Sequence, residues 1–173
     1  MSAGSLPLHI EPFKWADRGA EVNTSVPLKS FKRLLDGALS DQGVVTVRCD
    51  FARDAQGVAW LTGVATTSVS LTCQRCLEAV QVDLDAEFRL ALVADDAAAD
   101  ALPEDEDFLV VGDDNLVLQE VVEDELILAL PLAPTHDDCE LAYTPDAAEG
   151  ASEDKRENPF QVLAAIKGQD QDQ

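Results

Sequence analysis

The chain has 173 residues, of which 46% are hydrophobic and 27% are charged, and its formal net charge is -22 at pH 7. This length suits one domain with additional segments, and this apolar fraction excludes wholesale disorder. No apolar run reaches the roughly 20 residues of a membrane span, and the N-terminal residues lack the pattern of a secretory signal. We therefore expect a cytoplasmic protein without membrane contact, whose cysteines stay reduced.

The negative charge is concentrated in the second half of the chain. Residues 1–94 carry 11 acidic and 9 basic side chains, whereas residues 95–157 carry 21 acidic side chains and only Lys155 and Arg156 as bases. Such a surface repels phosphate backbones and attracts basic proteins. The charge therefore disfavours binding of bare nucleic acid by this half.

The first predicted helix lies in the sequence SVPLKSFKRLLDGAL, residues 25–39, where Pro27 suits the first turn and apolar residues recur on one side. Its basic residues Lys29, Lys32 and Arg33 form the only basic cluster in the chain. We interpret them as a solvated helix face. The alternative is a contact with RNA or with a partner protein.

Three strands are predicted next, at residues 43–54, 58–72 and 79–93. Apolar and polar residues alternate in the first and third segments, and the second is rich in β-branched residues. Short turns join the three, which predicts an antiparallel meander with one covered face. The alternation also indicates that Cys49 is a small core residue.

A second helix is predicted after an exposed loop at 94–107 and a short strand at 108–114. The sequence LVLQEVVEDELILAL, residues 116–130, has helical apolar spacing and ends at Pro131. We interpret its acids, at positions 120 and 123–125, as a solvated face rather than a catalytic set. The expected packing side consists of Leu118, Val121, Val122, Glu125 and Leu128, widened by Leu126 and Leu130.

Together these elements predict an α+β fold, in which an antiparallel β-sheet, a meander of about four to six strands, packs with two amphipathic helices. Residues 1–141 form this single domain. Residues 142–157 are acidic and contain proline, which predicts a flexible linker. Residues 158–173 carry a short apolar segment that can dock, followed by a tail.

The sequence LTCQRCLEAV, residues 71–80, places Cys73 and Cys76 at a strand-to-strand turn. A thioredoxin-type redox pair needs a following helix to lower the thiol pKa, and the alternation after Cys76 predicts a strand instead. A zinc knuckle suits this position, and His136 and Cys139 downstream complete a Cys₃His ligand set. The alternative is that the cysteines line the turn without metal and His136 is an ordinary loop histidine.

Catalytic motifs are absent from the sequence. There is no glycine-rich phosphate loop and no nucleophile elbow, and the chain has only 2 histidines. His9 lies in LPLHIEPF, residues 6–13, a predicted edge strand, and has no evident partner. We therefore predict that the protein is not an enzyme.

Four segments carry a resemblance to a known family. They are LPLHIEP near the start, LTCQRCLEAV in the middle, VVEDELILALPLAPTHDDCE after it, and ENPFQVLAAIKG near the end. In this order and spacing, the chain resembles the large ribosomal RNA subunit accumulation protein family, also called YceD, over nearly its whole length. The pair CQRC and EDELILALP is a specific combination.

The resemblance implies a bacterial cytoplasmic protein, without established enzymatic activity, that is needed for large-subunit ribosomal RNA to be made, processed or kept stable. It also implies a gene that commonly neighbours one for a small basic large-subunit ribosomal protein. Many relatives carry a longer cysteine-rich segment where this chain has HDDC. Either His136 substitutes for a thiol, or this branch has lost the site.

Charge and resemblance together favour an indirect role. RNA-binding domains present a basic stripe and stacking aromatic residues, whereas this chain is only 5% aromatic. We expect its acidic half to bind a basic large-subunit ribosomal protein or assembly factor, so that ribosomal RNA is affected indirectly. One alternative is an RNA-contacting module that uses Lys29, Lys32, Arg33 and Arg75. The other is a metal-dependent hydrolase that acts on ribosomal RNA.

Overall fold

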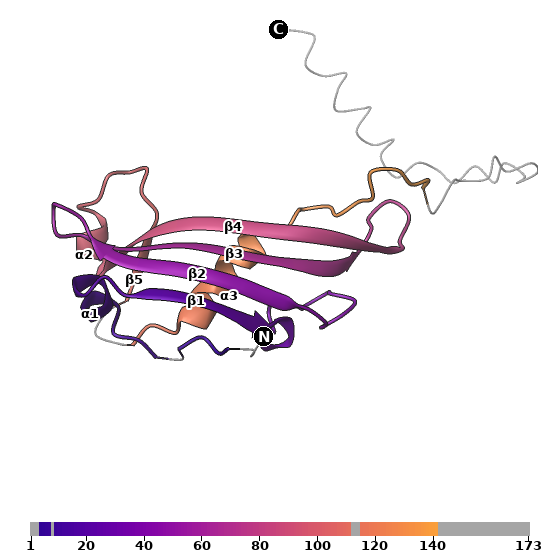
Figure 1. Cartoon of the computed structure of the whole chain (residues 1–173). Coiled ribbons are helices and arrows are strands. Elements are labelled where there is room, and N and C mark those ends of the chain that lie inside the picture. The colour runs from indigo at the N-terminus through magenta and orange to yellow at the C-terminus, as the bar shows by residue number, and fades with distance from the viewer. Residues whose placement is uncertain (1–3, 8, 112–114, 142–173) are drawn as a thin grey trace, which may run out of the picture. The chain divides into compact units, whose positions relative to one another are not determined.

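A 5-stranded sheet organises the protein in the computed structural model, which describes residues 4–7, 9–111 and 115–141 (Figure 1). The strands follow one another in chain order: β1 (Glu21–Pro27), β2 (Val44–Arg53), β3 (Ala59–Thr72), β4 (Ala79–Val93) and β5 (Phe108–Val110). The first four pair in antiparallel fashion, which confirms the predicted meander, and β5 is parallel to β4. The α+β class is confirmed, and the sheet is mixed because residues 94–107 return the chain before β5.

Alternation along the strands decides which face of the sheet is buried. On β4, Leu84, Phe88 and Leu90 are buried. Asp83 and Asp85, on either side of Leu84, are exposed. The β3–β4 register is continuous over the whole length of β3, so no bulge reverses the two faces. The period-two pattern therefore predicts the buried face of the sheet correctly.

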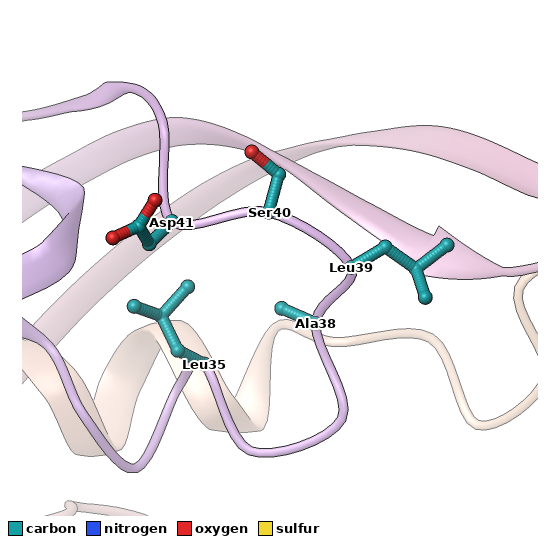
Figure 2. A pocket seen from close by; sticks show the side chains of 5 residues that line it. All are labelled: Leu35, Ala38, Leu39, Ser40 and Asp41. Carbon is teal, nitrogen blue, oxygen red and sulfur yellow. The ribbon is translucent and has the colours of Figure 1, made fainter.

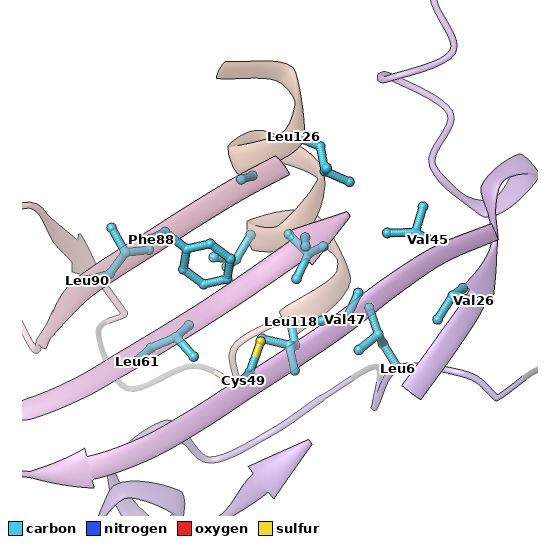
Figure 3. Packing of buried hydrophobic residues seen from close by; sticks show 14 of the residues in the cluster. Leu6, Val26, Val45, Val47, Cys49, Leu61, Phe88, Leu90, Leu118 and Leu126 are labelled. Atoms are coloured by element: carbon cyan, nitrogen blue, oxygen red, sulfur yellow. The ribbon is translucent and has the colours of Figure 1, made fainter. Parts of the chain in front are cut away.

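Helix α3 (Leu118–Leu128) crosses the buried face, as Figures 1 and 3 show. Leu118 and Leu126 on this helix are both fully buried in the core that includes the sheet residues. The predicted helix at 116–130 is confirmed. The prediction was wrong for Leu128, whose side chain is 77% exposed, and for Glu123, which is only 6% exposed.

The predicted helix at 25–39 is wrong. Ser25 lies in β1 and pairs with Thr46, because the extended backbone there completes the ladder with β2. A single 3-10 turn, η1 (Leu28–Ser30), and hydrogen-bonded turns follow, up to Gly37, whose φ of 86° is left-handed. The apolar spacing nevertheless indicates buried positions correctly, since the side chains of Leu28, Phe31 and Leu34 are fully buried.

Two short helices stand where other structure was expected. Helix α1 (Pro12–Asp17) begins at the end of the predicted edge strand at 6–13, because proline is favoured in the first turn of a helix. Among the described residues of that segment, the strand character is limited to one bridge, between Ile10 and Leu116. Helix α2 (Asp96–Ala99) lies within the predicted loop at 94–107 and is capped by the Asp95 side chain.

The described residues form one compact unit. The predicted linker at 142–157 and the predicted docking segment at 158–173 lie outside the described residues, as does the end of the predicted strand at 108–114. Among the described residues, no helix is long and apolar enough to cross a membrane.

Candidate metal centre

The four predicted ligands, Cys73, Cys76, His136 and Cys139, lie together at one end of β3 and β4, and their ligand atoms are all within 4.8 Å of one another. Cys73 Sγ is 3.8 Å from Cys139 Sγ, and Cys76 Sγ is 3.3 Å from His136 Nδ1. Zinc bonds of about 2.3 Å to sulfur and about 2.0 Å to nitrogen require tetrahedral ligand separations of roughly 3.5–3.8 Å. The donor set and its spacing therefore fit one tetrahedral zinc ion.

The turn between β3 and β4 positions the first two cysteines. Cys73 Sγ accepts hydrogen bonds from the backbone N–H groups of Arg75 at 3.4 Å and Cys76 at 3.5 Å. The Cys73 N–H donates to the carbonyl of Glu78 at 2.8 Å, which closes the turn. Leu77 adopts a φ of 63°, in the left-handed region, so that the chain can re-enter β4 directly after Cys76. This turn places both thiols within 4.8 Å of each other.

The segment after α3 brings the other two ligands to the turn. The carbonyl of Pro134 accepts a hydrogen bond from the Gln74 N–H at 2.8 Å, which fixes this segment beside the cysteine turn. His136 Nε2 lies 3.1 Å from the Ala79 carbonyl oxygen. When Nε2 donates a proton to that carbonyl, Nδ1 keeps the lone pair that a metal ligand needs.

Hydrogen bonds to sulfur favour the thiolate form at Cys73. Burial raises the pKa of Cys73, but backbone N–H groups of Cys76, Arg75 and His136 lower it more, so that it falls to about 5. The Arg75 side chain donates from Nε to Cys139 Sγ at 2.9 Å. This bond is the largest cause of the raised pKa of Arg75. Arg75 also donates to the His136 carbonyl at 2.6 Å. This contact of Arg75 was not predicted from the sequence, although its position between two predicted ligands was a signal.

Cys49 lies apart from this group, in the core. It is fully buried on β2, and burial, followed by the charge of Asp50, raises the pKa of its thiol to about 12. The prediction that Cys49 is a core residue is confirmed.

The predicted RNA-contact residues divide into two kinds. Lys29 and Lys32 are exposed. Arg33 instead forms ion pairs with Glu123 and Asp124 on α3. The pKa of Arg33 is raised, and the hydrogen bond to Asp124 is the largest cause. Two of the four basic residues, Arg33 and Arg75, are thus engaged within the protein.

A shallow pocket elsewhere provides no comparable site. Figure 2 shows that its lining comes from a single stretch of chain, residues 35–41. It presents one carboxylate, Asp41, which accepts a hydrogen bond from Gln42. Within the described ranges, the Cys₃His set is the one group of three or more metal-binding side chains.

The fold and site define a class of protein: an α+β protein whose sheet carries a four-ligand Cys₃His set at its β3–β4 turn. The family model described as Large ribosomal RNA subunit accumulation protein YceD matches residues 61–167, a range that contains all four ligands. A protein of that name from Haemophilus influenzae is 34% identical over 174 residues, which cover 96% of this chain and 99% of that protein. The chain belongs to this YceD family. No solved structure matches it.

Proposed function

We propose that this protein is a non-enzymatic ribosome-biogenesis factor of the cytoplasm that supports the accumulation of large-subunit ribosomal RNA. The observation that carries this proposal is the match to the Haemophilus influenzae protein, which is named for that role and is matched over 96% of this chain. A match of this extent covers the sheet, α3 and the metal-ligand set together.

In this proposal the Cys₃His set binds zinc in a structural role. The four side chains would fill all four positions of a tetrahedral ion, so that none would remain open for water or a substrate. Zinc bound there would join the β3–β4 turn to the segment after α3, which lie 60 residues apart in the sequence. The chemistry it supplies is cross-linking, and no catalytic step depends on it.

The partner in this proposal is a basic large-subunit ribosomal protein or assembly factor. Besides the acidic half of the chain, three acids of β4, Asp83, Asp85 and Glu87, project from alternate positions of the strand onto the exposed face of the sheet. None of the three forms an ion pair within the described part of the chain, whose ion pairs involve other acids. These carboxylates are therefore available to a cationic partner. Arg33 forms an ion pair with Glu123, and Arg75 donates to Cys139. These contacts with the protein's own residues favour this model over direct RNA contact.

A depletion experiment tests the cellular role. Removing the protein from its own bacterium should lower the ratio of large-subunit to small-subunit ribosomal RNA, and a plasmid-borne copy should restore it. An unchanged ratio under conditions of rapid growth would contradict the proposal.

A binding experiment tests the partner. Purified protein should bind basic large-subunit ribosomal proteins at low salt and lose affinity as salt rises, because the attraction is screened. A variant with Asp83→Asn, Asp85→Asn and Glu87→Gln should bind at least tenfold more weakly. The matched control removes the same charge elsewhere, with Glu21→Gln, Asp36→Asn and Glu78→Gln. Equal weakening by both triple variants would show that net charge, and not these three carboxylates, causes the binding. Tight binding to ribosomal RNA alone would favour the RNA-contacting alternative.

A further inference from the structure

Arg75 contacts the metal-ligand set from inside the turn that supplies half of it. It stands between Cys73 and Cys76, yet its guanidinium reaches across to the segment after α3. Nε donates to Cys139 Sγ at 2.9 Å and Nη2 donates to the carbonyl of His136 at 2.6 Å. A single side chain thereby contacts the ligand pair that comes from the other end of the sequence.

These two contacts use the planar, forked geometry of the guanidinium. The Nε and Nη2 donors point in fixed relative directions, so that binding both acceptors orients His136 and Cys139 together. A lysine ammonium has no such fork and would satisfy one acceptor at a time. Arg75 is half-buried, which strengthens these bonds relative to a solvated surface contact.

The charge of Arg75 also matches what a loaded site would carry. Three thiolates and one neutral imidazole around Zn²⁺ leave one excess negative charge. The guanidinium is always protonated, so it supplies one compensating positive charge at the sulfur of Cys139. Groups that hydrogen-bond to metal ligands typically contribute about 10–100-fold to metal affinity.

We propose that Arg75 is a positioning residue of the zinc centre, which fixes Cys139 and the His136 backbone for metal binding and offsets the excess charge of the loaded site. This inference rests on the proposed zinc site. Arg75 then acts within the protein and not as a surface contact to RNA, since both of its donor groups are directed at the segment that carries His136 and Cys139.

The test is a zinc competition titration against a chromogenic chelator, performed on the full chain. Arg75→Gln should lower zinc affinity by about 10–100-fold. Arg75→Lys should recover only part of the loss, because it restores the charge without the fork. Arg48→Gln is the matched control, because Arg48 is an exposed arginine on β2 with a single ion pair to Asp50, and it should bind zinc like the wild type.

Cobalt substitution separates a direct contact from a loss of folding. The thiolate-to-cobalt charge-transfer band should shift to lower energy in Arg75→Gln, because a thiolate that loses a hydrogen bond releases an electron more easily. Circular dichroism should show the same β-sheet content in all variants. Wild-type zinc affinity and an unshifted band in Arg75→Gln would overturn the role of Arg75 and leave the zinc site standing. Failure of the wild type to bind one zinc would overturn both.

Discussion

The carboxylate of Glu123 on α3 accepts a hydrogen bond from the backbone N–H of Arg33 at 2.7 Å, across 90 positions of the sequence. The same oxygen accepts the Leu34 N–H at 3.2 Å, and the second oxygen receives the Arg33 side chain at 3.2 Å. The turn after η1 has no helical ladder to satisfy these N–H groups, so Glu123 satisfies them instead. One buried carboxylate therefore joins α3 to the segment between β1 and β2.

Replacing Glu123 by alanine should destabilise the protein by about 2–3 kcal/mol, because it leaves one buried and one part-buried backbone N–H group, and part of the Arg33 side chain, without their acceptor. Glu120→Ala on the same helix is the control. Its side chain is exposed, and Arg33 uses only its backbone carbonyl, so the change should stay within about 0.5 kcal/mol. Urea denaturation measures both, and equal effects would contradict the role of Glu123.

Leu77 should respond to substitution through its backbone. Its φ of 63° costs an L-residue about 1–2 kcal/mol, whereas glycine accepts this conformation without strain. The side chain is 65% exposed, so little packing is lost on its removal. Leu77→Gly should therefore be neutral or stabilising by up to about 1 kcal/mol, and Leu77→Val should destabilise by about 1 kcal/mol or more, because β-branched residues fit this region worst. Thermal unfolding of the two variants checks the order, which would be reversed if the turn were formed differently.

Cys49 should be the last thiol to react. Its pKa of about 12 keeps it protonated at neutral pH, and its side chain is fully buried. In protein treated with a chelator, Ellman's reagent at pH 8 should modify the half-buried Cys76 and Cys139 first and Cys49 only on unfolding. In Cys49→Ala the late-reacting thiol should be missing. Rapid reaction of all 4 thiols in native protein would contradict the core position of Cys49.

Asp54 should make a pH-dependent contribution to stability. Its side chain accepts the Trp60 indole N–H at 2.8 Å, and this bond, the largest cause, lowers the pKa of Asp54 below the ordinary value of 3.8. A carboxyl whose folded pKa is depressed contributes stability that is fully present above its unfolded pKa and is lost as the pH falls through the folded pKa. The loss should therefore occur below about pH 3.8.

Asp54→Asn removes this titration and serves as the comparison. The difference in unfolding free energy between wild type and Asp54→Asn should be constant from pH 7 to pH 5 and should shrink as the pH falls further. NMR titration of the Asp54 carboxyl carbon gives the folded pKa directly. A pKa at or above 3.8 would contradict the Trp60 contact.

The strands show how much of the fold local sequence can predict. Alternation on β4 predicts its buried residues because each strand residue faces one side of the sheet, whatever lies further along the chain. Residues 25–39 show the limit of this approach. Their apolar spacing indicates correctly that Phe31 and Leu34 are buried, but a helix and a series of turns can bury the same positions, and pairing with β2 decides between them.

The basic residues show a second limit. The sequence reveals the charges of Arg33 and Arg75 but not which acceptors they reach, because Glu123 and Cys139 lie 90 and 64 positions away. In the sequence, Glu123 is one of four acids on a predicted solvated face. In the structure, the turn after η1 packs against Glu123 and buries it.

Composition and neighbouring residues are enough to predict the meander, the acidic character of the chain, and a Cys-x-x-Cys turn with two candidate ligands downstream. The folded chain is needed to show that the ligand atoms of His136 and Cys139 come within 4.8 Å of the two cysteine sulfurs of that turn, and that Arg75 is directed at them. Those contacts depend on the path of the chain from β4 through α3. Local residue patterns do not encode that path, since it is set by the packing of the whole core.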